Sequence, residues 1–175
     1  DVAALVDYLL RKTPAPLLLD ADAINALAGR PEAVRACAQP VVLTPHPGEL
    51  ARLLGTDVAT IQGDRLAAAR AAAERTGAIV VLKGAGTLIA QTGQPTWINL
   101  TGNPGMACGG CGDVLAGLLV GLLAQGLPPF DAACAAVWIH GNAGDYAALR
   151  HTQAAMRASD VAAALPDTFR YVSLR

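Results

Sequence analysis

The sequence of 175 residues is poor in aromatic and charged residues and carries almost no net charge. Phe, Trp and Tyr make up 4% of the chain, Asp, Glu, Lys and Arg make up 15%, and the formal net charge is −1. Without a basic excess there is no electrostatic reason to expect nucleic acid or an acidic membrane surface as a partner. Hydrophobic residues reach 53%, which excludes a disordered chain and predicts one domain with a large buried core.

Long apolar runs are missing as well. A transmembrane helix needs about 20 consecutive apolar residues, and the longest candidate, Val114–Ala124, is shorter. We interpret this segment as a fully buried helix of a soluble protein. The chain opens at Asp1 without a basic and apolar leader, so we expect no signal peptide. Because Asp1 stands where an initiator Met is usual, we also expect that the chain is part of a longer polypeptide.

Cysteines are few, and they predict no disulfide scaffold. Cys37, Cys108, Cys111 and Cys134 lie in a domain with ample core, so a reducing cytoplasm is the expected compartment. Cys108 and Cys111 form a CxxC pattern at an expected helix start, a position that lowers the pKa of a thiol in redox proteins. A zinc site would need two more ligands, and the sequence has no second CxxC or close histidine pair. A redox module remains an alternative, although it leaves the neighbouring glycines unexplained.

Hydrophobic periodicity predicts strands that alternate with helices. The expected strands are Leu17–Asp20, Val41–Thr44, Ala78–Leu82, and a hairpin of Leu88–Ala90 with Thr96–Asn99. The expected helices are Val2–Leu10, Ala23–Ala28 capped by Asp22, one from Pro31, one carrying Leu50, Leu53 and Leu54, Ile61–Arg75, one from near Gly112, Pro129–Leu149 and Ser159–Leu165. This alternation predicts an α/β fold with a mostly parallel sheet, helices on both faces and an antiparallel edge.

Polar or glycine-rich segments follow three of the predicted strands. They are Asp20–Asp22, Thr44–Glu49 and Lys83–Thr87. In open α/β sheets, ligands bind beyond the carboxyl ends of the parallel strands. The three segments therefore predict a binding site at that edge of the sheet.

The segment Asn103–Asp113, with the sequence NPGMACGGCGD, precedes an expected apolar helix. Glycines allow a backbone to approach a phosphate closely, and the first amides of a helix have no partner within it. These amides and the helix dipole predict an anion-binding site. Asp113 can accept the proton of a hydroxyl nucleophile there, as acidic residues do in other phosphoryl-transfer sites. The alternative is that Asp113 only caps the helix.

Lys83–Thr87 (KGAGT) follows a strand but does not lead into a helix, so it is neither a P-loop nor a dinucleotide fingerprint. Its glycines, cation and hydroxyl fit a nucleotide phosphate or ribose. The alternative is a hairpin turn whose lysine extends toward solvent.

The three histidines have different expected roles. His46 lies between two prolines at a strand end, which favours a binding role, and Glu49 is either its partner or only a favourable charge at a helix start. We interpret His140, on an apolar helix face, as a packing residue with satisfied hydrogen bonds. We expect His151, at the basic end of a helix, to be solvated.

Three motifs, by order and spacing, resemble those of the NAD(P)H-hydrate dehydratase family. They are Thr44–Glu49 (TPHPGE), Val81–Thr87 (VLKGAGT) and Asn103–Asp113. Asp20–Asn25 and His140–Asp145 are similar to minor signatures of the family, so the resemblance covers essentially the whole chain. It implies a ribokinase-like fold and a nucleotide-dependent dehydration that returns (6S)-NAD(P)H hydrate to NAD(P)H. The C6 hydroxyl is expected to be phosphorylated and then lost as phosphate.

The resemblance also implies roles for individual residues. The catalytic residue would be Asp113, with Gly110 and Gly112 in the anion-binding loop. The nucleotide would contact Lys83, Gly84, Ala85, Gly86, Thr87, Asn103, Pro104, Gly105, Met106, Ala107, Cys108, Gly109, Gly110, Cys111 and Gly112. The hydrated nicotinamide would contact His46, Pro47, Gly48, Glu49 and Asp113.

Cofactors and partners follow from the same resemblance. The phosphoryl donor is expected to be ADP rather than ATP, because Asn103–Ala107 is similar to bacterial-type members. Magnesium would bridge the phosphates, without protein ligands that we can name. We expect a cytoplasmic homo-oligomer that binds no nucleic acid or membrane, with an epimerase domain fused upstream or as a partner.

The chain departs from the family pattern in two ways. Cys108 and Cys111 replace the Ser and the Met or Thr that the resemblance leads us to expect in the anion-binding loop, which predicts sensitivity to oxidation. The family domain is also longer, so we interpret residues 1–175 as a partial dehydratase domain that lacks its N-terminal part. Two alternatives stay open beside the dehydratase: a ribokinase-like kinase of small alcohols, of hydroxymethylpyrimidine or hydroxyethylthiazole type, and a non-catalytic nucleotide-binding fragment.

Overall fold

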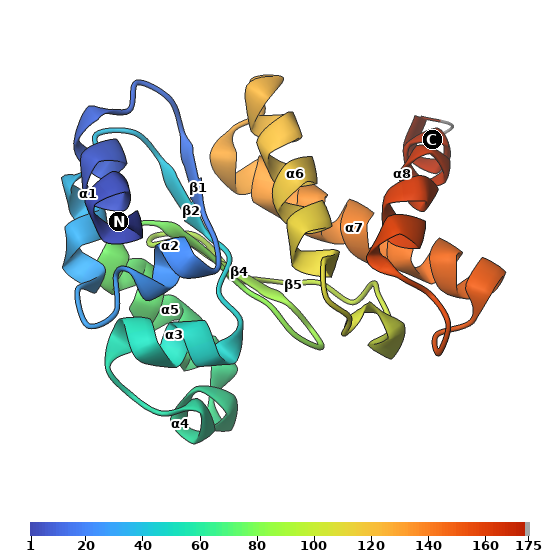
Figure 1. Cartoon of the computed structure of the whole chain (residues 1–175), viewed down its shortest axis with the longest axis horizontal. Helices are drawn as coiled ribbons and strands as arrows, with labels where there is room; N and C mark the ends of the chain where they lie inside the picture. Colours follow the sequence, from blue (N-terminus) through green and yellow to red (C-terminus); the bar gives the residue numbers. More distant parts are fainter. Residues whose placement is uncertain (174–175) are drawn as a thin grey trace. The chain divides into compact units, whose positions relative to one another are not determined.

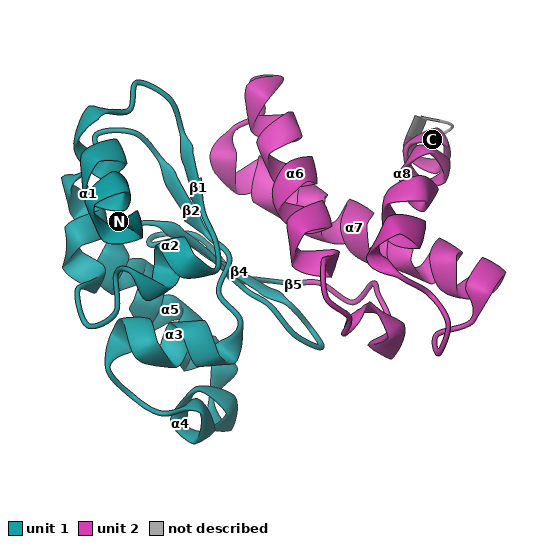
Figure 2. Cartoon of the chain, viewed as in Figure 1, with its two compact units in different colours: residues 1–98 teal, residues 99–175 magenta. Residues whose placement is uncertain are grey.

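The computed structural model describes residues 1–173, which form two compact units (Figures 1 and 2). Unit 1 comprises Asp1–Ile98 and holds the whole sheet, whereas unit 2 begins at Asn99 and consists of helices and loops. Each unit has a core of its own.

The sheet of unit 1 has five strands in the order β1-β2-β3-β4-β5. The strands are β1 (Leu17–Leu19), β2 (Val41–Leu43), β3 (Ile79–Leu82), β4 (Leu88–Ala90) and β5 (Trp97–Ile98). The first three are parallel, with Leu18 opposite Val42 and Leu43 opposite Val80, and β4 and β5 form the antiparallel edge. The predicted mixed sheet and its hairpin edge are therefore confirmed.

Helices pack on this sheet through apolar side chains. Those of unit 1 are α1 (Val2–Lys12), α2 (Asp22–Asn25), the 3-10 helix η1 (Pro31–Ala36), α3 (Pro47–Leu54), α4 (Val58–Gly63) and α5 (Arg65–Thr76). Their apolar faces and one face of the strands form a shared core, which includes Leu43, Leu50 and Val80. On the other face, Val42 and Val81 are fully buried too, as the continuous apolar runs of a parallel sheet predict.

Two predicted helices of unit 1 differ from the structure. The expected Ile61–Arg75 helix is two helices, because the side chain of Asp64 accepts a hydrogen bond from the Ala67 amide at 2.9 Å and starts α5 as its N-cap. Asp22 was expected to cap a helix over Ala23–Ala28. Instead it is the first residue of the four-residue α2, and its carboxylate lies 3.5 Å from the side-chain amide of Asn25.

Unit 2 contains the short 3-10 helix η2 (Pro104–Met106) and the helices α6 (Cys111–Ala124), α7 (Pro129–His151) and α8 (Ala158–Ser173). The interpretation of Val114–Ala124 as a fully buried helix is wrong. Only the stripe that begins at Cys111 and continues through Leu115, Leu119 and Leu122 is buried, whereas Val120 is 47% exposed. Because every residue of Val114–Ala124 is apolar, the sequence did not reveal that only one stripe of the helix, with a period of 3.6 residues, is buried.

Helix α8 is longer than predicted. We expected it to end at Leu165, because the residue before a proline usually leaves the helical conformation. The helix instead continues through Pro166, since the residues that follow make tertiary contacts: Thr168 is fully buried and Asp167 pairs with Arg150 of α7 at 2.6 Å. No helix within residues 1–173 combines the length and the hydropathy that a membrane crossing requires.

Candidate functional site

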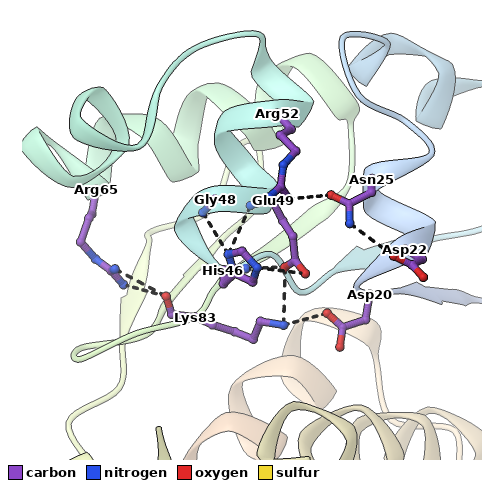
Figure 3. A network of polar contacts seen from close by, with 9 residues as sticks. All are labelled: Asp20, Asp22, Asn25, His46, Gly48, Glu49, Arg52, Arg65 and Lys83. Atoms are coloured by element: carbon purple, nitrogen blue, oxygen red, sulfur yellow. Dashed lines mark hydrogen bonds and ion pairs between the residues drawn. The ribbon is translucent and has the colours of Figure 1, made fainter. Parts of the chain in front are cut away.

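Four polar side chains converge at the carboxyl ends of the parallel strands of unit 1 (Figure 3). This strand-end cluster consists of Asp20, His46, Glu49 and Lys83. The Lys83 Nζ lies 2.8 Å from the Asp20 Oδ1 and 3.7 Å from the Glu49 Oε2. The three predicted strand-end segments therefore meet as expected, with Asp20 rather than Asp22 in contact with the lysine.

His46 is held as a helix cap. Its ring Nδ1 accepts hydrogen bonds from the amides of Gly48 at 3.0 Å and Glu49 at 3.3 Å, while the Glu49 Oε2 accepts from the His46 amide at 2.7 Å. This reciprocal arrangement is a capping box at the start of α3. Because Nδ1 accepts, the ring proton is assigned to Nε2, which lies 3.4 Å from the Glu49 Oε1. The ring is 50% exposed, so its role as a cap does not bury it.

The charges of the strand-end cluster limit what it can bind. With His46 in the neutral form that its hydrogen bonds require, two carboxylates surround one ammonium, and Glu49 is only 5% exposed. Lys83 is thus not the free, solvent-directed cation of the alternative interpretation. Two carboxylates repel a phosphate, so a neutral ligand with hydrogen-bonding groups fits this cluster better.

The conformation of the Lys83–Thr87 segment is fixed by Arg65, which the sequence did not single out. Arg65, at the start of α5, donates hydrogen bonds to the carbonyl oxygens of Leu82 at 3.3 Å and Lys83 at 3.4 Å. Gly84 adopts φ +144°, which favours glycine, and a Cβ there would lie 2.6 Å from the Arg65 Nη1, which would have to move. Partial burial lowers the pKa of the guanidinium. Nothing in the pattern of an Ala-rich helix distinguishes Arg65 from Arg70, so no sequence signal could have identified it.

In unit 2, the glycine loop (Cys108–Gly112) forms a separate candidate anion site. Gly110 is the N-cap of α6 and adopts φ +91°, which favours glycine. The Cys111 amide donates to the Cys108 carbonyl at 3.4 Å, and the Val114 amide to the Gly110 carbonyl at 3.1 Å. Within residues 1–173, the amides of Gly109, Gly110, Gly112 and Asp113 have no hydrogen-bond acceptor. Such unpaired amides at a helix start provide donors for an anion.

Asp113 is the third residue of α6 and is exposed beside these amides. Its carboxylate makes no hydrogen bond or ion pair with any other described residue, and α6 has no side-chain cap. The alternative role of Asp113 as a helix cap is therefore not what the structure shows. This free carboxylate, beside amides that could bind an anion, is available to accept a proton.

Helix α7 holds the segment that leads into the glycine loop. The carboxylate of Asp145 accepts hydrogen bonds from the Gly102 amide at 2.9 Å and from the Asn103 side chain at 3.0 Å. The Asn103 Oδ1 in turn accepts from the Gly105 amide at 3.0 Å. A Cβ on Gly141 would lie 2.2 Å from the Thr101 hydroxyl, so the small residues of α7 let the segment pack directly on the helix.

The two cysteines of the glycine loop face each other. Their Sγ atoms are 3.2 Å apart, and both thiols are free. Burial, with the neighbouring Cys108 thiol as a second cause, raises the pKa of Cys111 to about 12. The lowered thiol pKa of the redox-module alternative is not found at Cys111, because burial disfavours the charged thiolate.

His140, on α7, differs from the prediction of a packing residue whose hydrogen bonds are satisfied. Burial lowers its pKa to about 4, an effect that an interaction with the Cys111 backbone partly opposes. Its Nε2 is buried without a hydrogen-bond partner among the described residues, as is the hydroxyl of Thr44 at the end of β2. His151 is 49% exposed and lies 3.8 Å from Asp160, which confirms its solvated position.

A pocket of about 220 Å³ lies beside the amino end of β2, among residues that include Arg35, Cys37 and Pro40. The guanidinium of Arg35 is already bound to the backbone carbonyls of Glu74 and Arg75 at the end of α5. This pocket contains none of the predicted site residues.

Known proteins resemble this chain over nearly all of its length. A bifunctional NAD(P)H-hydrate repair enzyme Nnr from Moorella thermoacetica is 49% identical over 166 residues, which are 95% of this chain and 31% of that protein. An ADP-dependent (S)-NAD(P)H-hydrate dehydratase from Neisseria meningitidis is 49% identical over 147 residues, 82% of this chain and 49% of that protein. The chain thus spans a third to a half of these two relatives.

Solved structures agree with the sequence relatives. The ADP/ATP-dependent NAD(P)H-hydrate dehydratase from Bacillus subtilis, co-crystallised with ATP/Mg2+, matches with a TM-score of 0.85 at 35% identity, over 95% of this chain and 58% of that one. A ribokinase-like superfamily protein from Enterococcus faecalis matches with a TM-score of 0.78 at 30% identity, over 97% of this chain and 58% of that one. The predicted ribokinase-like α/β fold is therefore confirmed. The sequence profile of the NAD(P)H-hydrate dehydratases matches residues 1–167, and the chain belongs to this family.

Proposed function

We propose that the protein containing this chain converts (6S)-NAD(P)H hydrate back to NAD(P)H in a reaction that consumes ADP or ATP, with ADP preferred. The observation that carries this proposal is the glycine loop: among residues 1–173, four of its backbone amides have no acceptor and lie beside a carboxylate that has no partner. That combination suits phosphoryl transfer to a hydroxyl group, because it offers both charge stabilisation and a proton acceptor.

The chemistry assigns a role to each part of the loop. Asp113 accepts the proton of the C6 hydroxyl as its oxygen attacks the terminal phosphorus of the nucleotide, and the amides of Gly109, Gly110 and Gly112 hold the charge that develops on the phosphoryl oxygens. The bond from phosphorus to the leaving phosphate of ADP breaks and releases AMP. The C6 oxygen then departs with the phosphoryl group as inorganic phosphate, and loss of a ring proton restores the double bond.

We assign the two ligands on the basis of charge. The nucleotide phosphates belong to Asn103–Gly112, where no acidic side chain competes for the free amides. The hydrated nicotinamide is neutral and belongs to His46, Pro47, Gly48 and Glu49, in the carboxylate-rich strand-end cluster. Lys83–Thr87 supplies backbone amides and the Thr87 hydroxyl to the nucleotide, since the Lys83 ammonium is already paired.

Magnesium fits this arrangement only together with the nucleotide. Among residues 1–173, no group of three or more His, Cys, Asp or Glu side chains could hold a metal ion. Mg²⁺ commonly keeps several waters and binds through one or two carboxylates plus substrate phosphates. When bound, it would supply positive charge to the phosphates, which would hold it in place of a set of protein ligands.

We also propose a cellular compartment, a second domain and an oligomeric state for the parent protein. Free thiols at all four cysteines are what a reducing cytoplasm produces. Relatives that are longer and named bifunctional support a second domain in the parent protein, which we assign to an epimerase. Exposed apolar side chains such as Trp97, at 58%, and Leu100, at 88%, support a homo-oligomer.

Recovery of reduced-nicotinamide absorbance from hydrated NADH tests the proposed function. The assay contains magnesium and either ADP, ATP or no nucleotide, and it is run on this chain and on the longer protein. We expect recovery by the longer protein that requires nucleotide and is faster with ADP. Equal recovery without nucleotide, or none from the longer protein with either nucleotide, would refute the proposal.

A further inference from the structure

The glycine loop contains two thiols that the proposed reaction does not use. The Sγ atoms of Cys108 and Cys111 lie 3.2 Å apart, whereas a disulfide bond is about 2.05 Å long. The sulfurs therefore need to approach by little more than an ångström to bond. Gly109 and Gly110, between the two cysteines, offer the backbone freedom for this approach.

The two thiols differ in accessibility. Cys108 is partly exposed, whereas Cys111 is 5% exposed and belongs to the core formed by α6, α7 and α8. A small reagent in solution can thus reach Cys108 first, and Cys111 is placed to react with whatever forms there. Cys37 lies in unit 1 and Cys134 on α7, and neither has a sulfur partner among the described residues.

We propose that Cys108 and Cys111 are a reversible redox modification site, which low-molecular-weight disulfides such as oxidised glutathione convert to an intramolecular disulfide. The Cys108 thiolate attacks one sulfur of the small disulfide, whose S–S bond breaks and releases one thiol. Cys111 loses its proton and attacks the Cys108 sulfur of this mixed disulfide, which releases the second thiol. Two electrons pass from the cysteine pair to the small disulfide, and two protons are transferred with them.

The disulfide changes the conformation of the part of the glycine loop that carries the free amides. Closure ties Cys108 to Cys111 and confines Gly109 and Gly110 within the ring. These two residues supply two of the four unpaired amides. A loop drawn together in this way cannot adjust to a phosphate, so oxidation weakens ADP binding at least tenfold. This consequence rests on the proposed function, whereas the formation of the disulfide does not.

Thiol counting on the full chain tests the site directly. The chain is incubated with oxidised glutathione, alkylated, and analysed by intact mass and peptide mapping, which identifies the linked cysteines without any variant. We expect two of the four thiols to be protected together, through a Cys108–Cys111 link that excess dithiothreitol reverses. Four alkylated thiols, or a link that involves Cys37 or Cys134, would overturn the proposal.

Single variants test the order of the two steps. In Cys111→Ser the mixed disulfide with glutathione should accumulate on Cys108, whereas in Cys108→Ser the buried Cys111 should remain unmodified. Cys134→Ser is the matched control and should form the disulfide like the native chain. Accumulation of glutathione on Cys111 in Cys108→Ser would overturn the assignment of Cys108 as the attacking thiol.

Calorimetric titration of the longer protein with ADP tests the effect of the disulfide on binding separately from its formation. We expect the reduced protein to bind ADP at least ten times more tightly than the oxidised protein, with recovery after dithiothreitol. Equal affinity of the two forms would refute an effect of the disulfide on the loop. If the reduced longer protein binds no ADP while the disulfide still forms, the proposed nucleotide role fails and the redox site stands.

Discussion

Several polar side chains near the two candidate sites bind backbone groups of their own unit. His46 caps α3, Arg65 holds the end of β3, and Asp145 holds the segment before the glycine loop. Each of these side chains fixes a turn that a ligand would contact. Substitution of any of these side chains should therefore change the free energy of unfolding as well as the activity.

Arg65 should contribute more to stability than Arg70 of the same helix. Arg65→Ala leaves the carbonyl oxygens of Leu82 and Lys83 without this donor, and an unpaired buried acceptor costs about 1–3 kcal/mol. Arg70 is exposed, and within residues 1–173 its side chain donates to the Thr96 hydroxyl alone, so Arg70→Ala should cost less than about 0.5 kcal/mol. Urea unfolding of both variants checks this difference. Equal costs would mean that Arg65 does not hold the strand end.

His140 should make the stability of the chain depend on pH. Its pKa is about 4 in the folded chain and about 6.5 when unfolded, so the unfolded state binds more protons between these values. Its contribution is fully present above pH 6.5 and is lost as pH falls toward 4. A shift of this size corresponds to a loss on the order of 3 kcal/mol.

Unfolding free energies measured between pH 7 and pH 4 test this dependence. His140→Gln should lose less stability over that interval than the native chain does, since Gln does not titrate. His151→Gln, at a half-exposed position, is the control and should follow the native curve. A His140→Gln curve parallel to the native one would show that His140 is not a buried neutral histidine.

At the scale of elements, glycines on α6 and α7 should respond in opposite directions to alanine. A Cβ on Gly141 would meet the Thr101 hydroxyl at 2.2 Å and the Thr101 backbone at 2.8 Å. Gly141→Ala should therefore destabilise the chain by about 1–3 kcal/mol and weaken ADP binding, because the segment before the glycine loop must move. A Cβ on Gly117, inside α6, would meet no other described residue within 4 Å beyond its own helix backbone, so Gly117→Ala should stabilise by about 0.5–1 kcal/mol.

Thermal or urea unfolding, with ADP titration of each folded variant, measures both effects. If Gly141→Ala is neutral in both assays, the close packing of α7 on Thr101 does not position the loop. If Gly117→Ala also weakens ADP binding, the effect of Gly141→Ala is not specific to that packing.

The strands and the site segments were predictable because their signals are local. Apolar runs that end in polar or glycine-rich turns located β1, β2 and β3 and the segments that follow them. The helix boundaries at Asp64 and Pro166 were not predictable in the same way. A side-chain cap decided the first, and contacts of Asp167 and Thr168 with α7 overrode the proline at the second.

Partners within the sites were less predictable, because they are distant in sequence. Lys83 and Asp20 are 63 residues apart, and Asp145 and Asn103 are 42 residues apart. Both Asp20 and Asp22 follow the same strand, and only the fold selects the one that meets the lysine. The burial of Cys111 and His140 likewise depends on how α6, α7 and α8 pack.

At the scale of the whole molecule, each of the two units carries one candidate site. Unit 1 presents paired charges suited to a neutral ring, and unit 2 presents free amides and a free carboxylate suited to phosphate chemistry. In the proposed reaction, Asp113 accepts the proton while the glycine loop holds the nucleotide. Binding and turnover should therefore respond differently to a change at residue 113.

The most direct measurement compares ADP affinity and NADH recovery in the longer protein carrying Asp113→Asn. Asp131→Asn, on the exposed first turn of α7, is the matched control. We predict that Asp113→Asn lowers the recovery rate about 10²–10⁴-fold and leaves ADP affinity within about threefold, less than 1 kcal/mol, while the control changes neither. Unchanged recovery in Asp113→Asn, or loss of ADP binding equal to the loss of rate, would contradict the account.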